Sequence, residues 1–242
     1  MTEYHLRIAV SAEDLARQTA EQVASRIDLA LAERDRAQIA LAGGETPRAT
    51  YQRLGSDHLP WERVDVLLGD ERWVSPDDPA SNARLLRETL LAQAPAHAAA
   101  FHPVPTGEAT PAASAEAYAR VLSELGGGPF PCFDVILLGL GDDGHTASLF
   151  PGSEALAVRD RSVTVGEGKG LARITFTAPL LSAARQVIFL VSGSNKRQAL
   201  ERLLDPQEPV ERTPARLVQP RTEVLILADA EAAAGLPERV TA

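Results

Sequence analysis

The stretch Phe133–Pro151, FDVILLGLGDDGHTASLFP, decides the fold of this chain. Its apolar run Val135–Leu138 is typical of a buried strand, and three glycines then break that strand. Parallel α/β sheets present reactive side chains in loops just beyond the carboxyl ends of their strands. Asp143 and His145 stand in such a loop, where a carboxylate and an imidazole can serve as an acid–base pair.

The same glycines match the dinucleotide-binding pattern G-x-G-x-x-G, as Gly139, Gly141 and Gly144. That pattern works when free backbone amides meet a pyrophosphate, and the carboxylates of Asp142 and Asp143 would repel this anion. We therefore do not predict a dinucleotide-binding site at this turn. The remaining alternative to an acid–base site is a tight strand-to-helix turn with solvated acids.

Composition limits the classes of protein to consider. The 242 residues are 45% hydrophobic and 24% charged, which suits a globular α/β protein, and we expect a single domain over residues 1–242. The net charge of -9 argues against nucleic acid or an anionic membrane as partner. Cys132 is the only cysteine, so no intrachain disulfide can form. With neither a signal peptide nor a membrane-length apolar run, we expect a cytoplasmic protein.

Metal binding is not expected, because no two of the five histidines have the helical spacing of a metal site and the cysteine has no thiol partner. The sequence does not fix the oligomeric state, and we expect a monomer or a small homo-oligomer.

Apolar runs and amphipathic segments alternate along the chain, which predicts a three-layer αβα fold with a mostly parallel central sheet and Rossmann-like topology. Strands are expected over residues 6–10, 38–42, 64–68, 133–138, 186–191 and 224–228. Helices are expected over 13–33, 47–54, 81–91, 111–125 and from about 194 to 204, with Ser11 as an N-cap. Residues 162–165 and 173–177 read as further strands, the second half-exposed or at an edge, and residues 92–111 as a loop.

Two glycine loops have the form of anion sites. Gly43-Gly44-Glu45-Thr46-Pro47 offers free backbone amides, a hydroxyl and a helix start. Ser192-Gly193-Ser194-Asn195-Lys196 adds a lysine in a first helical turn, where the helix dipole disfavours a cation unless an anion binds beside it. The alternatives are an ordinary glycine turn capped by Thr46 and a solvated surface lysine.

Charged residues also follow the strand at 64–68. Asp70-Glu71-Arg72 is either a solvated turn or a group that holds sugar hydroxyls and an oxyanion or phosphate. Ser81-Asn82 is most simply a helix cap, near enough in sequence to make a second substrate contact.

In combination these motifs resemble the 6-phosphogluconolactonase family. The resemblance runs from Ala42 to Pro220, and its most specific part is residues 139–151. It implies hydrolysis of 6-phospho-D-glucono-1,5-lactone to 6-phosphogluconate in the oxidative pentose phosphate pathway, with no cofactor. The implied substrate is thus a phosphorylated sugar lactone.

The resemblance also implies roles for particular residues. His145 would be the general base, Asp143 would hold its imidazole, and Arg72 would stabilise the oxyanion or reach the phosphate. The 6-phosphate would bind Gly43, Gly44, Thr46 and Lys196, and the sugar would contact Asp70, Glu71 and Asn82. Ser148 is a conceivable nucleophile, but the G-x-S-x-G elbow is absent around it, so direct attack by water is favoured.

Two other functions fit parts of the sequence. Glucosamine-6-phosphate deaminases share the Gly-x-Gly-x-Asp-Gly-His turn, but they typically carry tyrosine where this chain has Arg72 and glutamate where it has Phe150. A phenylalanine cannot transfer a proton. A non-catalytic sugar-phosphate sensor is the second alternative. The acidic net charge and the lack of a helix-turn-helix extension argue against it, because such sensors are generally joined to a DNA-binding segment.

Overall fold

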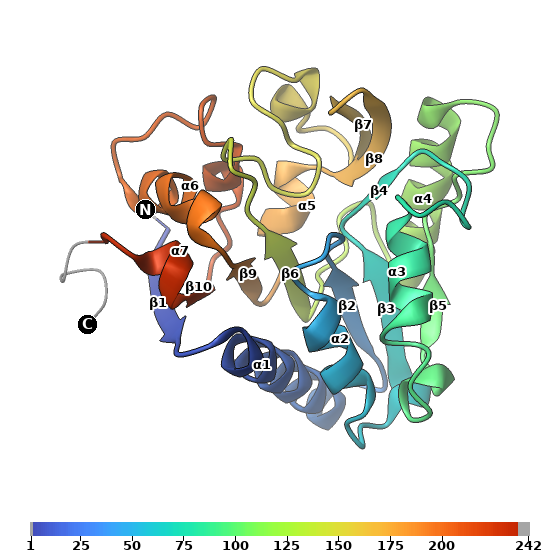
Figure 1. Cartoon of the computed structure of the whole chain (residues 1–242). Helices are drawn as coiled ribbons and strands as arrows, with labels where there is room; N and C mark the ends of the chain where they lie inside the picture. Colours follow the sequence, from blue (N-terminus) through green and yellow to red (C-terminus); the bar gives the residue numbers. More distant parts are fainter. Residues whose placement is uncertain (1, 237–242) are drawn as a thin grey trace.

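The computed structural model describes residues 2–236, which form ten strands and seven α-helices (Figure 1). The strands are β1 (Tyr4–Ala9), β2 (Ala37–Leu41), β3 (Val64–Leu68), β4 (Asp70–Arg72), β5 (Ala100–His102), β6 (Val135–Gly139), β7 (Val163–Gly168), β8 (Leu171–Phe176), β9 (Val187–Val191) and β10 (Val224–Asp229). The helices are α1 (Ala12–Glu33), α2 (Arg48–Gly55), α3 (Asn82–Glu88), α4 (Pro111–Gly126), α5 (Ala178–Ser182), α6 (Arg197–Leu204) and α7 (Ala230–Ala233). Among these helices, none combines the length and the apolarity needed to cross a bilayer.

Seven strands form one parallel sheet in the order β1-β10-β9-β6-β2-β3-β5, which confirms the predicted three-layer α/β fold. From β2 the chain moves outward through β3 to β5, and from β6 it moves outward the other way through β9 to β10. The loops that follow β2 and β6 therefore diverge to opposite sides. This reversal opens a crevice between the two strands, where open α/β sheets bind their ligands.

Helix α1 packs along β1, β2 and β10, and Figure 1 shows it beside α2 at the front of the sheet. It buries Leu15, Val23 and Ile27, the face that the helical spacing predicts. The hydroxyl of Ser11 accepts a hydrogen bond from the backbone N–H of Asp14, so the predicted N-cap is confirmed.

The other three strands form a small antiparallel sheet in the order β4-β8-β7. The prediction that residues 173–177 lie half-exposed or at an edge is wrong, because β8 is the central strand and Arg173 to Phe176 are all buried. The ring of Phe176 packs 5.9 Å from that of Tyr118 in α4 and 5.3 Å from that of Phe133. Thr175 looks like a solvent-facing residue in the sequence, yet its hydroxyl bonds Ser148 and Phe176 inside the protein.

Several element bounds differ from the sequence prediction, including the following three. The expected loop over 92–111 contains β5, a three-residue edge strand that pairs with β3 and is too short for a periodic signal. Helix α3 ends at Glu88 rather than near Leu91. A 3₁₀ turn over Ser194–Lys196 precedes α6, so the regular helix begins one residue beyond the lysine.

A tyrosine fixes the carboxyl end of β3, where the chain turns from the main sheet into the small one. The hydroxyl of Tyr118 accepts a hydrogen bond from the N–H of Leu68 and donates one to its carbonyl, both at 3.0 Å and both buried. One side chain thus satisfies two backbone groups at the point where strand pairing ends.

We predict that Tyr118→Phe lowers the free energy of unfolding by about 1–3 kcal/mol, because it leaves two buried backbone groups without a partner at nearly unchanged volume. Chemical denaturation measures the change. Tyr4→Phe is the matched control, since within residues 2–236 the hydroxyl of Tyr4 makes no hydrogen bond. Equal stability of the two variants would contradict the role given to Tyr118.

Candidate active site

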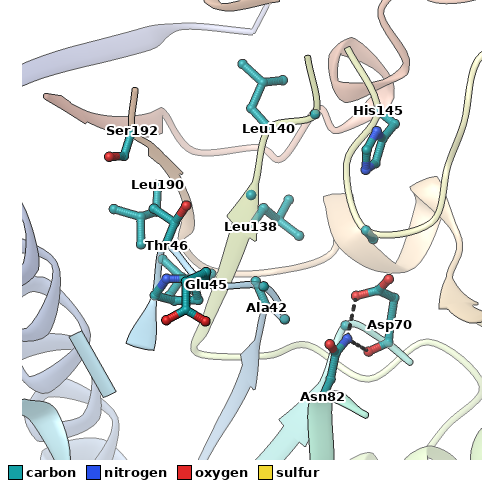
Figure 2. A pocket seen from close by; sticks show the side chains of 18 of the residues that line it. Ala42, Glu45, Thr46, Asp70, Asn82, Leu138, Leu140, His145, Leu190 and Ser192 are labelled. Atoms are coloured by element: carbon teal, nitrogen blue, oxygen red, sulfur yellow. Dashed lines mark hydrogen bonds between the residues drawn. The ribbon is translucent and has the colours of Figure 1, made fainter. Parts of the chain in front are cut away.

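A cavity of about 260 Å³ lies at the carboxyl ends of β2, β6 and β9 (Figure 2). The loops that follow these strands line it, together with β4 and the hairpin that joins β7 to β8. Figure 2 shows His145 and Asp70 on one side of β6, and Thr46 and Ser192 on the other. The polar groups therefore fall into two sets that face the same space.

The turn after β6 is held by its own backbone. Gly141 donates to the carbonyl of His145 at 2.8 Å, Gly144 donates to the carbonyl of Gly141 at 3.0 Å, and the hydroxyl of Thr146 donates to the carbonyl of Gly139 at 2.8 Å. Gly144 has a φ of +91°, which glycine adopts without strain. These bonds fold the chain back over the end of β6 and bring His145 to the cavity.

The carboxylate of Asp143 contacts His145 twice. Its Oδ1 lies 2.5 Å from Nδ1 of the imidazole and accepts the backbone N–H of His145 at 3.0 Å. A carboxylate partner favours the proton on Nδ1, which leaves the lone pair on Nε2 free. The ring of Phe150 packs against the imidazole with centroids 4.2 Å apart. The imidazole is thus fixed in orientation and in tautomer.

Burial and charge act in opposite directions on this pair. Burial lowers the pKa of His145 below its ordinary value, although the hydrogen bond and charge of Asp143 act to raise it. Burial alone would raise the pKa of Asp143, but its hydrogen bonds from His145 outweigh this and the pKa lies below the usual range. At neutral pH the site therefore holds a neutral imidazole beside an ionised carboxylate.

Asp70, at the start of β4, is held from both sides. The hydroxyl of Ser148 donates to its Oδ2 at 2.6 Å, and the amide of Asn82 donates to its carbonyl at 2.9 Å and to its Oδ1 at 3.3 Å. Ser148 is fully buried by these contacts and does not line the cavity. Arg72 does line it, with Nη1 bonded to the carbonyl of Ala80 and to Oδ1 of Asn82, each at 2.7 Å.

Two predicted site residues do not line the cavity. Asp143 contacts His145, which does line it, whereas Glu71 is turned away from it. Its side chain points instead to the start of α3, where the carboxylate accepts the backbone N–H groups of Asn82 and Ala83 at 2.7 Å and the hydroxyl of Ser81 at 3.1 Å. Burial raises its pKa, against these hydrogen bonds. Alternation along β4 explains the difference, because Glu71 lies between two cavity-facing residues and points to the opposite face. Ser81 caps α3 as predicted.

The loop after β2 has room for a ligand because of its glycines. A Cβ on Gly43 would lie 1.9 Å from Oδ1 of Asn82, and Gly44 has a φ of +95°. Within the described residues, the backbone amides of 44–46 donate no hydrogen bond. Glu45 in the same loop is paired with Arg48 at 2.8 Å, which partly offsets its negative charge.

The loop after β9 is anchored by a carboxylate from β10. Asp229 accepts the hydroxyl of Ser192 at 2.6 Å and the backbone N–H of Gly193 at 3.0 Å. Gly193 has a φ of +96°, and Lys196 follows at the N-cap of α6, where it lines the cavity.

Four polar residues that line the cavity were not assigned to the site from the sequence: Glu45, Lys169, Arg173 and Ser192. Ser192 begins a loop that the sequence did single out. Lys169 and Arg173 belong to the β7–β8 hairpin, which the pairing of β8 with β4 brings to the site. A Lys-Gly pair between two strand-like segments was the available signal for a hairpin tip. No cluster of three or more metal-ligating side chains occurs within residues 2–236.

These features define a class: an α/β protein whose cavity, at the reversal of a parallel sheet, combines a histidine–carboxylate pair with the cationic side chains of Arg72, Lys169, Arg173 and Lys196. Comparison with known proteins narrows the class. The chain belongs to the family described as glucosamine-6-phosphate isomerases/6-phosphogluconolactonase, whose model matches residues 10–227.

Individual relatives agree with this assignment. A protein named 6-phosphogluconolactonase from Synechocystis sp. is 47% identical over 217 residues, covering 88% of this chain and 90% of the relative. The solved 6-phosphogluconolactonase of Trypanosoma brucei superposes with a TM-score of 0.86 at 31% identity, over 98% of this chain and all of that one. A monomeric glucosamine-6-phosphate deaminase shares the fold, with a TM-score of 0.81 at 22% identity.

We predict that Gly141→Ala disrupts the Asp143–His145 pair, because the added Cβ would lie 2.0 Å from Nδ1 of His145 and 2.6 Å from Oδ1 of Asp143. Loss of the carboxylate contact lowers the pKa of His145 further, and NMR titration of the imidazole measures this. Gly139→Ala is the control, because a Cβ there meets nothing within 4 Å. An unchanged His145 pKa in Gly141→Ala would show that the pair does not depend on this glycine.

Proposed function

We propose that this protein hydrolyses 6-phospho-D-glucono-1,5-lactone to 6-phosphogluconate, with His145 as the general base. The observation that carries the proposal is the Asp143–His145 hydrogen bond, which leaves Nε2 as a free base in a cavity that also holds cationic side chains. Lactone opening needs an activated water, a partner for the oxyanion and an anchor for the phosphate. The names of the relatives from Synechocystis sp. and Trypanosoma brucei support this substrate.

Because the imidazole of His145 is neutral, it can act as a general base in the reaction. Nε2 of His145 takes a proton from water as the water oxygen attacks the lactone carbonyl carbon, and a tetrahedral oxyanion forms. The C–O bond to the ring oxygen then breaks, and the ring oxygen takes the proton back from the imidazolium. The carboxylic acid that results loses its proton to solvent and becomes the product carboxylate. Asp143 stabilises the imidazolium between the two steps and ends the cycle unchanged.

Arg72 supplies positive charge to the bound substrate, and two roles are open to it. The guanidinium either stabilises the oxyanion or binds the phosphate, and the two roles differ in their dependence on the phosphate group. The variant Arg72→Met separates them: a loss of kcat on unphosphorylated gluconolactone as well identifies an oxyanion partner, and a loss confined to the phosphorylated lactone identifies a phosphate ligand.

The phosphate is assigned to the loops that follow β2 and β9. Unbonded amides in residues 44–46, the hydroxyl of Thr46 and the ammonium of Lys196 suit a dianion. Asp70 and Asn82 are left as ligands for sugar hydroxyls. Glu71 is not among the proposed contacts, since its carboxylate is used in capping α3.

Attack by water is favoured over a serine nucleophile. Ser148 is fully buried, and its hydroxyl donates to Asp70 at 2.6 Å. A nucleophile must instead meet the base and the substrate in the cavity.

The first test compares two reactions of the purified protein. We predict lactone hydrolysis well above the spontaneous rate and no ammonia release from glucosamine 6-phosphate. Deamination needs a second proton-transferring group, and Phe150, which packs on the His145 ring, cannot supply one. Ammonia release at a rate comparable to lactone hydrolysis would favour the deaminase, and sugar-phosphate binding without either reaction would favour a sensor.

The second test concerns the base. We predict that His145→Ala lowers kcat by about 10²–10⁴ with a much smaller change in KM. In the wild type, kcat/KM falls as the pH drops through a pKa below the ordinary histidine value, because protonated imidazole cannot accept the proton of water. Wild-type turnover in a folded His145→Ala protein would refute the role.

The third test concerns the phosphate. We predict that Lys196→Ala lowers kcat/KM for the phosphorylated lactone by about 10- to 150-fold, the value of a charge-assisted hydrogen bond. Hydrolysis of unphosphorylated gluconolactone should change little. Equal losses on both lactones would show that Lys196 does not bind the phosphate.

A further inference from the structure

The hairpin that joins β7 to β8 ends in an unusual turn. Gly168 pairs with Leu171, so the loop is the two residues Lys169 and Gly170, with φ values of 56° and 77°. Such turns favour asparagine or glycine at the first position, and lysine there is strained. Within residues 2–236 only Ala147 and Lys169 are non-glycine residues with positive φ, and both line the cavity. Strain of this kind concentrates at functional sites.

Close packing fixes the base of this turn beside the catalytic imidazole. A Cβ on Gly168 would lie 2.2 Å from the ring of Phe150, and that ring packs on His145 with centroids 4.2 Å apart. Arg173 donates to the carbonyl of Gly168 at 3.3 Å and lies 5.3 Å from the centroid of the Phe150 ring. The Phe150 ring thus packs between the backbone next to Lys169 and the imidazole of His145.

The charge of Lys169 is available to a ligand. The side chain lines the cavity, and it makes no ion pair with a carboxylate in the described part of the chain. Its positive charge also acts to lower the pKa of both His145 and Asp143, which agrees with a position near that pair. Lys196, by contrast, enters the cavity from the loop after β9.

We propose that Lys169 is a substrate-contacting residue at the lactone end of the cavity, where its ammonium binds the carbonyl oxygen as it becomes an oxyanion and then the carboxylate of the product. The proposal rests on the proposed lactone hydrolysis. It gives the two lysines separate tasks: Lys169 binds the reacting end and Lys196 binds the phosphate. Lys169 takes no part in the proton transfers, which run between water, His145 and the ring oxygen.

Equilibrium binding separates the two lysines without relying on turnover. The probes are 6-phosphogluconate, which has a carboxylate and a phosphate, and glucitol 6-phosphate, which has only the phosphate. Titration calorimetry should show that Lys169→Met weakens 6-phosphogluconate about 10- to 150-fold and changes glucitol 6-phosphate by less than about twofold. Lys196→Met should weaken both compounds.

Three further variants control for structure. Lys169→Gly removes the strain together with the charge and should lose binding as Lys169→Met does, whereas Lys169→Arg keeps the charge and should retain most of it. Glu167→Gln alters an exposed residue of the same hairpin outside the cavity and should change neither affinity. In Lys169→Met the pKa that limits kcat/KM at low pH should rise, because a positive charge near His145 is removed.

Equal weakening of both compounds by Lys169→Met would make it a phosphate ligand and overturn the proposal, as would no weakening of either. A wild-type protein that binds both compounds but does not hydrolyse the lactone refutes the proposed function alone, and the comparison of affinities still decides the role of Lys169. A wild-type protein that binds neither compound overturns both proposals.

Discussion

The reversal of the parallel sheet between β2 and β6 is the constraint on which the site depends. Adjacent parallel strands whose following loops diverge leave a crevice that their own side chains do not fill. A glycine stands two residues beyond the end of each strand, and the reason is steric at each. Gly43 leaves space for the Asn82 side chain, and Gly141 leaves space for the imidazole of His145. The sheet sets the position of the cavity, and these two glycines let polar groups approach its floor.

Three of the carboxylates close to this cavity have different properties because their surroundings differ. Asp143 is partly buried but doubly bonded to His145, so it stays ionised and orients the ring. Asp70 is held by Ser148 and Asn82 at the cavity wall. Glu71, next to Asp70 in β4, is turned away from the cavity and accepts backbone N–H groups at the start of α3. Neighbouring acids in the sequence thus divide between chemistry and structure according to which face of β4 they occupy.

The sequence predicted well where the physical signal is local. The apolar run Val64–Leu68 was placed to the residue, and the Ser11 and Ser81 caps follow from side chains that bond the next turn of the chain. The glycine-rich turn that carries Asp143 and His145 was also predicted, because its strand, its breaks and its acid–base pair lie within a dozen residues. What the sequence could not supply depends on distant partners. The central position of β8 depends on β4, and the orientation of Glu71 depends on α3. Lys169 reaches the cavity through the pairing of β8 with β4 and the packing of Gly168 on Phe150, and neither contact is local in the sequence.

The central claim is that His145 is a neutral base at neutral pH, with its proton on Nδ1 and its lone pair on Nε2. Nitrogen-15 NMR of the imidazole tests this directly. The account predicts the Nδ1–H tautomer at pH 7 and a pKa below the ordinary histidine value, equal to the pKa that limits kcat/KM at low pH. An Nε2–H tautomer, or an imidazole that is already protonated at pH 7, would contradict it.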